Sequence, residues 1–128
     1  SAANLGLDAS AALRELVTAA GPAIGEIHLA GHAVRITPAG AAVRIDDHGS
    51  AVSDEVWALY ADTIAMIGQR PTLIEWDTTI PEFSVLQREC AAAQAMLDRT
   101  QDNEARDARA RGRCRSARLP TCPRSTTA

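Results

Sequence analysis

One short stretch decides the predicted fold: Pro71-Thr72-Leu73-Ile74-Glu75-Trp76-Asp77. Its run of apolar and β-branched residues after a proline is typical of a short buried strand. A helix is predicted before it, over about 54–67 with Ser53 as the N-cap, and another after it, over about 82–98 with Pro81 at its start. A strand between two helices is the repeating unit of a parallel α/β sheet.

The residues before this unit continue the same pattern. A helix is predicted over about 9–19, and strands over 23–29 and 42–46, with a short pairing segment at 34–36 between them. Strands separated by helices imply right-handed crossover connections and a parallel sheet. Because three strands cannot complete such a sheet, residues 1–99 are expected to be the C-terminal part of a domain about twice as long.

Composition limits the class of protein. Of the 128 residues, 46% are hydrophobic but only 3% are aromatic, so alanine, leucine, isoleucine and valine must build the core. No apolar run approaches the ~18 residues of a membrane span, and no secretory leader opens the sequence, so no membrane partner is expected. Three cysteines at wide spacing do not form a disulfide framework. A reducing, cytoplasmic location is therefore expected.

Charge divides the chain into an acidic body and a basic end. Residues 1–99 contain six arginines and 13 acids, a net charge of −7, whereas residues 100–128 contain seven arginines and three acids, a net charge of +4. The acidic body argues against nucleic acid as a partner. Because no apolar periodicity continues beyond Thr100, residues 100–128 are expected to be a disordered Arg-rich tail. An RNA-binding arm and an out-of-frame extension are the alternatives for this tail.

Each of the three predicted strands ends in a pair of ionisable residues two positions apart. The pairs are Glu26 and His28, Asp46 and His48, and Glu75 and Asp77. Residues two apart on a strand point to the same side, so each pair places two ligand-type groups in one space at the carboxyl end of the sheet. Such clusters repel one another unless a cation lies between them, and imidazole with carboxylate is the ligand set of non-haem iron, manganese or zinc. The pattern therefore predicts a metal site.

Each member of this pattern also has an ordinary structural explanation. His28 can be a hydrogen-bonded histidine at the rim of the core, Asp47-His48-Gly49 is a plausible turn, and Glu75 can pair with an arginine. Their joint occurrence at three strand ends favours the metal site. His32 can contact a substrate, support a metal ligand, or be an ordinary loop histidine.

Several motifs occur together in a specific order. They are Asn4-Leu5-Gly6-Leu7-Asp8, Glu26-Ile27-His28-Leu29-Ala30-Gly31-His32, Ile45-Asp46-Asp47-His48, Val52-Ser53-Asp54-Glu55-Val56-Trp57, and Pro71-Thr72-Leu73-Ile74-Glu75-Trp76-Asp77 with Ile80-Pro81. In residues, order and spacing, the segment from about 4 to 97 resembles the multinuclear non-haem iron oxidases. This large bacterial family includes the iron oxidase subunit of methanobactin biosynthesis.

The resemblance implies a fold, a cofactor and partners. The fold would be the C-terminal portion of a xylose-isomerase-like TIM barrel, and the complete protein would hold two or three iron ions. Such enzymes use ferrous iron and dioxygen to oxidise cysteine residues of a ribosomally made precursor peptide, which a small partner protein presents. By motif position the implied iron ligands are His28, Asp46, His48 and Glu75. The residues implied to support these ligands or to face the substrate are His32, Asp77 and Glu26.

The sequence also departs from the family pattern. The N-terminal half, with the earlier ligands, is absent, and Gly49 and Ser50 stand where aspartate and histidine usually follow the Asp46-Asp47-His48 motif. With part of the ligand set missing, the chain is not expected to assemble the metal cluster or to catalyse alone. The alternatives are a different divalent-metal enzyme on the same barrel, of isomerase or phosphodiesterase type, and a non-catalytic truncated remnant.

Overall fold

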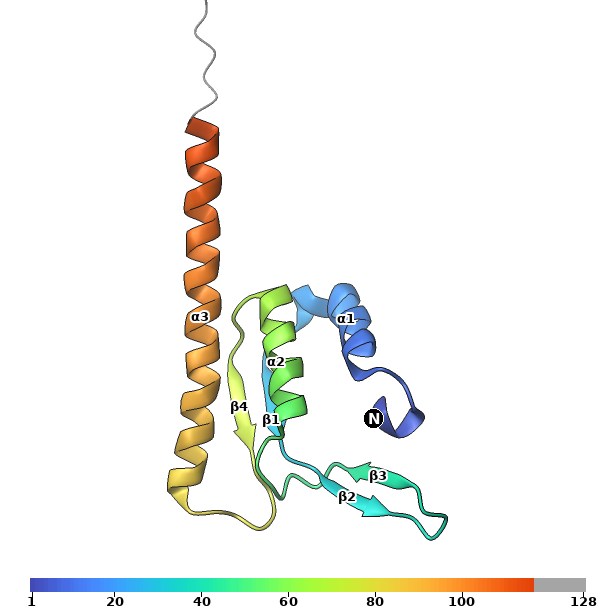
Figure 1. The fold of residues 1–128 in the computed structure, drawn as a ribbon. Helices are drawn as coiled ribbons and strands as arrows, with labels where there is room; N and C mark the ends of the chain where they lie inside the picture. Colours follow the sequence, from blue (N-terminus) through green and yellow to red (C-terminus); the bar gives the residue numbers. More distant parts are fainter. Residues whose placement is uncertain (117–128) are drawn as a thin grey trace, which may run out of the picture.

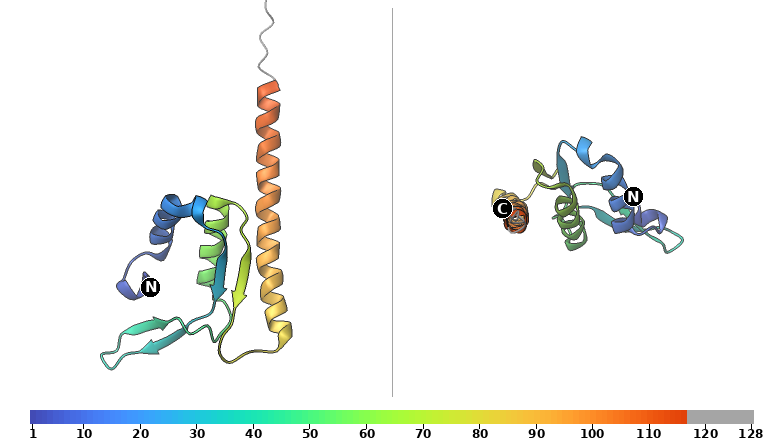
Figure 2. Two further views of the ribbon diagram at one scale, coloured as in Figure 1. Left: turned by 180° about the vertical axis from the view of Figure 1, so that it is seen from behind. Right: turned by 90° about the horizontal axis from the view of Figure 1, so that it is seen from above.

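The computed structural model describes residues 1–116, which form a small α/β body from which one long helix projects (Figure 1). In chain order the elements are the 3₁₀ turn η1 (Ala3–Leu5), α1 (Ala9–Ala20), the 3₁₀ turn η2 (Gly21–Ala23), β1 (Ile27–Ala30), β2 (Ala33–Ile36), β3 (Ala42–Ile45), α2 (Asp54–Ile67), β4 (Thr72–Glu75) and α3 (Phe83–Ser116). Seen from above, α1 and α3 lie on opposite sides of the body (Figure 2). The body is therefore a mixed α/β unit.

The helices α1 and α2 each begin after a residue whose side chain caps the N-terminus. The Asp8 side chain accepts a hydrogen bond from the backbone N–H of Ala11 at 3.0 Å and caps α1. The Ser53 hydroxyl accepts one from Val56 N–H at 3.4 Å and caps α2, whose first turn carries two acids. Gly68 ends α2 with a φ of 75°, a left-handed value that glycine adopts without strain. These two predicted helices are confirmed.

Strands β1 and β4 pair in parallel, with Ile27 opposite Thr72 and Ala30 opposite Glu75. The predicted first strand, over 23–29, therefore begins later than expected, at Ile27, and residues 21–23 form the turn η2. The expectation that Glu26 and His28 end this strand is wrong, because Glu26 precedes β1 and His28 is its second residue. One face of the pair packs against α2 and α3. The core on that face contains Leu29, Val52, Tyr60, Ile64 and Ala93, flanked by Ile27, Ile74, Met96 and Leu97. The parallel βαβ connection is compatible with part of a barrel; the closed barrel itself stays a prediction.

The expectation of a third parallel strand is wrong. Strand β3 pairs antiparallel with β2, and this hairpin is a separate sheet. The turn that joins the two strands is closed by a hydrogen bond from Thr37 N–H to the carbonyl of Ala41 at 2.8 Å and contains Gly40 at φ 82°. A tight turn this close to both strands favours pairing with the neighbour in sequence over pairing with β1 or β4. Figure 1 shows the hairpin projecting from the body.

The last helix is longer than predicted. Residues 100–116, expected to be disordered, continue α3, and residues 101–111 are exposed. The lack of an apolar stripe indicates a lack of contact with a core, but alanine, arginine, glutamine and glutamate have high intrinsic helix propensity. In the first part of α3, Cys90 is exposed and Ala93 is buried. The rest of the predicted tail, residues 117–128, lies outside the described residues.

None of the helices in the described part of the chain combines the length and the apolar character needed to cross a bilayer.

Candidate metal centre

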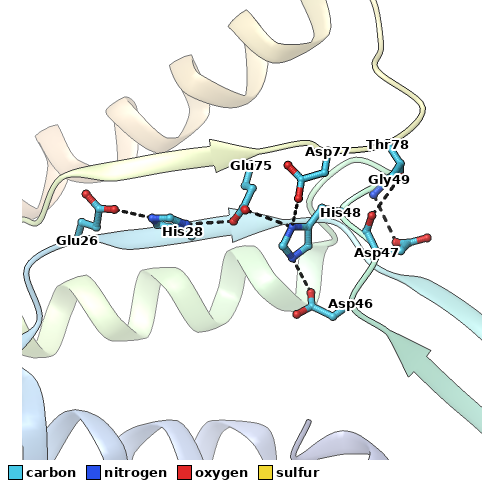
Figure 3. A network of polar contacts seen from close by, with 9 residues as sticks. All are labelled: Glu26, His28, Asp46, Asp47, His48, Gly49, Glu75, Asp77 and Thr78. Atoms are coloured by element: carbon cyan, nitrogen blue, oxygen red, sulfur yellow. Dashed lines mark hydrogen bonds and ion pairs between the residues drawn. The ribbon is translucent and has the colours of Figure 1, made fainter.

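The alternation of β1 and β4 separates the core from the candidate site. Leu29 and Ile74 point into the core, so His28 and Leu73, which pair with each other, lie on the opposite face of the sheet. Glu75 lies two residues beyond Leu73 and shares this face. The ionisable side chains therefore gather on the face that α2 and α3 do not cover, as Figure 3 shows.

His28 lies between two carboxylates. Its Nε2 is 2.6 Å from Oε1 of Glu26, and its Nδ1 is 3.0 Å from Oε2 of Glu75. Carboxylates only accept hydrogen bonds, so both ring nitrogens must carry a proton to satisfy both contacts. The hydrogen bonds to Glu26 and then Glu75 raise the pKa of His28 above its ordinary value of 6.5. In the absence of a metal, His28 is thus favoured as a cation.

His48 repeats this arrangement at the other end of Glu75. Its Nε2 is 2.9 Å from Oδ1 of Asp46, and its Nδ1 lies 3.0 Å from Oδ2 of Asp77 and 3.4 Å from Oε1 of Glu75. The hydrogen bond to Asp77 raises the pKa of His48, with electrostatic attraction from Asp46 and Glu75 in the same direction. Glu75 therefore contacts both imidazoles, one with each carboxylate oxygen, and joins β1 and the loop after β3 into one network (Figure 3).

The loop that carries His48 is held in place by the segment after β4. The His48 carbonyl accepts hydrogen bonds from the backbone N–H groups of Asp77 and Thr78, at 2.9 and 3.4 Å, and the Thr78 hydroxyl donates to the Asp47 carbonyl at 3.1 Å. His48 has a φ of 46°, a left-handed conformation that is uncommon for residues other than glycine. The turn expected at Asp47-His48-Gly49 is therefore compatible with a site role, because this backbone conformation aims the imidazole at Glu75.

Two further contacts hold this loop, and the sequence did not point to either. Gly31 packs so closely on the loop that a Cβ there would lie 2.0 Å from the carbonyl oxygen of Ser50. Glu89 of α3 accepts a hydrogen bond from the backbone N–H of Val52 at 2.8 Å through Oε1. The only sequence signal for Glu89 is an acidic residue beside the apolar stripe of its helix, which has many ordinary explanations.

The site contains a compact set of three donors. One ligand atom each from His48, Glu75 and Asp77 lies within 4.8 Å of the others. Mixed imidazole and carboxylate donors with partial exposure suit non-haem iron, manganese or zinc, so the residues present fit a metal of this kind. His28 and Asp46 adjoin the set through hydrogen bonds without belonging to it. Asp77 belongs to the set, whereas the resemblance placed it among the residues that support the ligands or face the substrate. The individual ligand assignments stay predictions.

His32 lies apart from this network. It borders an open, mostly apolar cavity of about 890 Å³ between α1, α2 and the end of β3, which also reaches Asp46. Its backbone carbonyl is 3.5 Å from the Ser50 hydroxyl. The structure thus brings six of the seven candidate residues together and places His32 next to a cavity that meets the network at Asp46.

Imidazoles and carboxylates gathered around Glu75, on one face of two parallel strands, define an α/β protein with a candidate metal-binding site. Comparison with known sequences identifies the family. The family model of RiPP precursor modification enzymes, named MbnB/TglH/ChrH, matches residues 1–98, and the chain belongs to this family. The family resemblance seen in the sequence is thereby confirmed, and the match ends shortly before the exposed part of α3.

Three relatives that match the chain share the name UPF0276 protein. The chain is 50% identical over 94 residues to a UPF0276 protein of Chromobacterium violaceum, covering 73% of this chain and 31% of that protein. It is 56% identical over 75 residues to one of Caulobacter vibrioides, covering 59% and 26%, and 46% identical over 99 residues to one of Bordetella parapertussis, covering 77% and 33%. The chain therefore spans about a third of their length or less. No solved structure matches it.

Proposed function

We propose that the chain is part of a multinuclear non-haem iron-dependent oxidase that uses dioxygen to modify cysteine residues of a ribosomally made precursor peptide. The observation that carries the proposal is the double contact of Glu75 with both imidazoles, on the uncovered face of the parallel strands. The family membership supports a precursor peptide as the substrate. A small protein that presents the peptide is part of the proposal.

The proposed ligands from this chain are His28, Asp46, His48 and Glu75. Asp77 joins them on geometry, because its carboxylate belongs to the compact donor set. Glu26 holds the ring of His28 in orientation through its 2.6 Å contact with Nε2. The chain matches about a third of the length of its relatives. We therefore propose that the remaining ligands of a centre with two or three ions lie in the part of those proteins that the chain does not match.

Bound iron would supply the redox chemistry with dioxygen. The residues of this chain would bind and orient it. Each imidazole can accept the metal only at a nitrogen that has lost its proton, and carboxylates adjacent to both rings can take part in moving that proton. His32, at the rim of the cavity beside Asp46, is placed to contact a substrate segment that enters there.

Ferrous iron binding under anaerobic conditions tests the proposal. We expect the chain to bind ferrous iron in equilibrium dialysis, and His48→Asn to weaken binding by about tenfold or more, a loss typical of removing a ligand or its support. Asparagine is chosen because it tolerates the left-handed backbone of residue 48. His32→Ala, outside the donor set, is the matched control and should bind like the parent.

The metal content of a full-length relative, measured with and without the same substitutions, distinguishes the remaining alternatives. Two or three irons with oxygen-dependent change in the mass of a precursor peptide support the oxidase. Zinc or manganese in their place supports another divalent-metal enzyme, and equal iron binding by His48→Asn and the parent chain overturns the ligand assignment.

A further inference from the structure

The two edges of the β2–β3 hairpin differ. On the β3 edge the side chain of Asn4 forms two hydrogen bonds with the backbone of Arg44: its Nδ2 donates to the carbonyl and its Oδ1 accepts from the N–H, both at 2.8 Å. The backbone groups of Arg44 therefore point away from β2. Because Val34 is the antiparallel partner of Arg44, its own N–H and carbonyl point away from β3, toward the outer edge of β2.

The same alternation applies to Ile36. Thr37 donates its N–H inward to Ala41 at 2.8 Å, so its neighbour Ile36 faces outward like Val34. In the described part of the chain, no other strand pairs with this edge of β2. The side chains of Val34 and Ile36 are 56% and 68% exposed. Figure 1 shows β2 as the outer strand of the hairpin, farther from α1 than β3.

The hairpin is connected to the candidate metal centre through both of its chain ends, which lie together because Ala33 pairs with Ile45. Strand β2 follows His28 by way of Gly31 and His32, and β3 leads directly into Asp46 and His48. A strand added along the outer edge of β2 would therefore run beside the segment that follows His28 and His32, with one of its ends near the site. The hairpin, residues 33–45, also carries two arginines and no acid, although the body around it is strongly acidic.

We propose that the outer edge of β2 binds an extended segment of the peptide substrate as an added strand. The backbone groups of Val34 and Ile36 pair with the peptide, and their side chains receive apolar residues at alternate positions. Arg44 pairs with Glu55 of α2 at 2.7 Å, so the charge preference of the edge comes from Arg35, which is exposed on β2 and favours a segment that also carries acidic residues. That the occupant is the substrate rests on the proposed function.

A second copy of the chain fits this edge less well. Pairing of two strands of four residues each covers far less than the roughly 1,000 Å² expected of a specific interface between two proteins. Short edge pairing of this kind suits a transient peptide, which gains affinity from a few backbone hydrogen bonds.

The substitution Val34→Pro tests the edge directly. Proline removes the outward N–H of residue 34, while the hydrogen bonds between β2 and β3 use other residues, so the hairpin is expected to stay folded. Val34→Thr keeps both the N–H and the β-branched shape and is the matched control. Protection of the Arg35 and Val43 amides, measured by hydrogen exchange, verifies that the hairpin is intact in both variants.

The probe is a fluorescein-labelled octapeptide that alternates valine with threonine and glutamate, together with a copy that is N-methylated at alternate residues. We expect the parent chain and Val34→Thr to bind the first peptide and Val34→Pro to bind about tenfold more weakly, as the loss of an edge hydrogen bond predicts. N-methylation that blocks pairing should have a similar effect. In NMR titrations the Val34 and Ile36 amides should shift more than that of Arg35.

Equal binding by the parent and Val34→Pro, no binding of the octapeptide, or insensitivity to N-methylation would each overturn the inference. So would a chain dimer in sedimentation that Val34→Pro dissociates, because the edge would then serve a second copy. None of these measurements uses metal or turnover. Failure of peptide binding with intact iron binding therefore rejects the edge alone, whereas peptide binding at the edge together with a full-length relative that holds no iron rejects the proposed oxidase.

Discussion

Glu75 is the residue on which the geometry of the site depends, because it is the only described carboxylate in contact with both His28 and His48. Its backbone belongs to β4, so the rigid parallel pair fixes its position. His48 lies in a loop, and its left-handed backbone conformation places its imidazole beside Glu75. A strand residue and a loop residue thereby meet although 27 positions separate them in sequence.

The raised pKa values of His28 and His48 predict a pH-dependent stability of the metal-free chain. Protonated imidazoles are stabilised by carboxylates in the folded state only, so this contribution is full below the unfolded pKa near 6.5 and is lost as pH rises through the higher folded values. Thermal melts with a chelator should therefore show a lower Tm at pH 9 than at pH 6. His32→Ala should keep this dependence and the double variant His28→Gln, His48→Asn should lose most of it; a Tm that rises with pH would contradict the prediction.

Glu89 is predicted to support the His48 loop through Val52. Val52 is 7% exposed, so losing its acceptor leaves a buried N–H without a partner, at a cost of about 1–3 kcal/mol. Glu89→Ala should lower the free energy of unfolding in urea by this amount. Glu89→Gln keeps an acceptor oxygen and should cost less than about 1 kcal/mol, and the amide of Val52 should exchange faster only in the alanine variant. Equal losses in both variants would show that the negative charge, and not the hydrogen bond, matters.

At the scale of elements, helices were easier to predict than strand pairing. The caps at Asp8 and Ser53 and the stop at Gly68 are local signals, and each acts within one turn of its helix. Pairing of β3 depends on partners that the strand itself does not specify. Its alternating residues suit a parallel or an antiparallel neighbour equally, and the turn after Thr37 decides the outcome.

The site residues were predictable because the pattern of paired ligand types does not depend on this choice. His48 reaches Glu75, and Asp46 adjoins His48, although β3 lies in a hairpin and not in the parallel sheet. The supporting contacts of Gly31 and Glu89 were not predictable, because they depend on the distance between segments that only tertiary packing sets.

At the scale of the whole molecule, α3 has two parts with different environments. Its first part contributes Ala93, Met96 and Leu97 to the core, and Gln69 of the body donates to the Leu97 carbonyl at 2.9 Å. After Leu97, two contacts with the body follow: a long hydrogen bond between Gln69 and Gln101 at 3.4 Å, and the approach of the Glu104 side chain to Gly68. The exposed, arginine-rich part of α3 is therefore helical without support from the core. This part also lies outside the family match.

Truncation after Glu104 should therefore leave the body as stable as in the full chain. Removal of exposed residues without core contacts changes the free energy of unfolding by no more than about 0.5 kcal/mol, so the Tm should stay within a few degrees while helical circular dichroism falls in proportion to the residues removed. Truncation after Arg88 is the control, because it removes the buried Ala93 and the acceptor Glu89 and should unfold the body. A Tm that drops by more than about 5 °C on truncation after Glu104, the shift expected for a loss of 1 kcal/mol or more, would mean that the basic part of α3 stabilises the acidic body through charge.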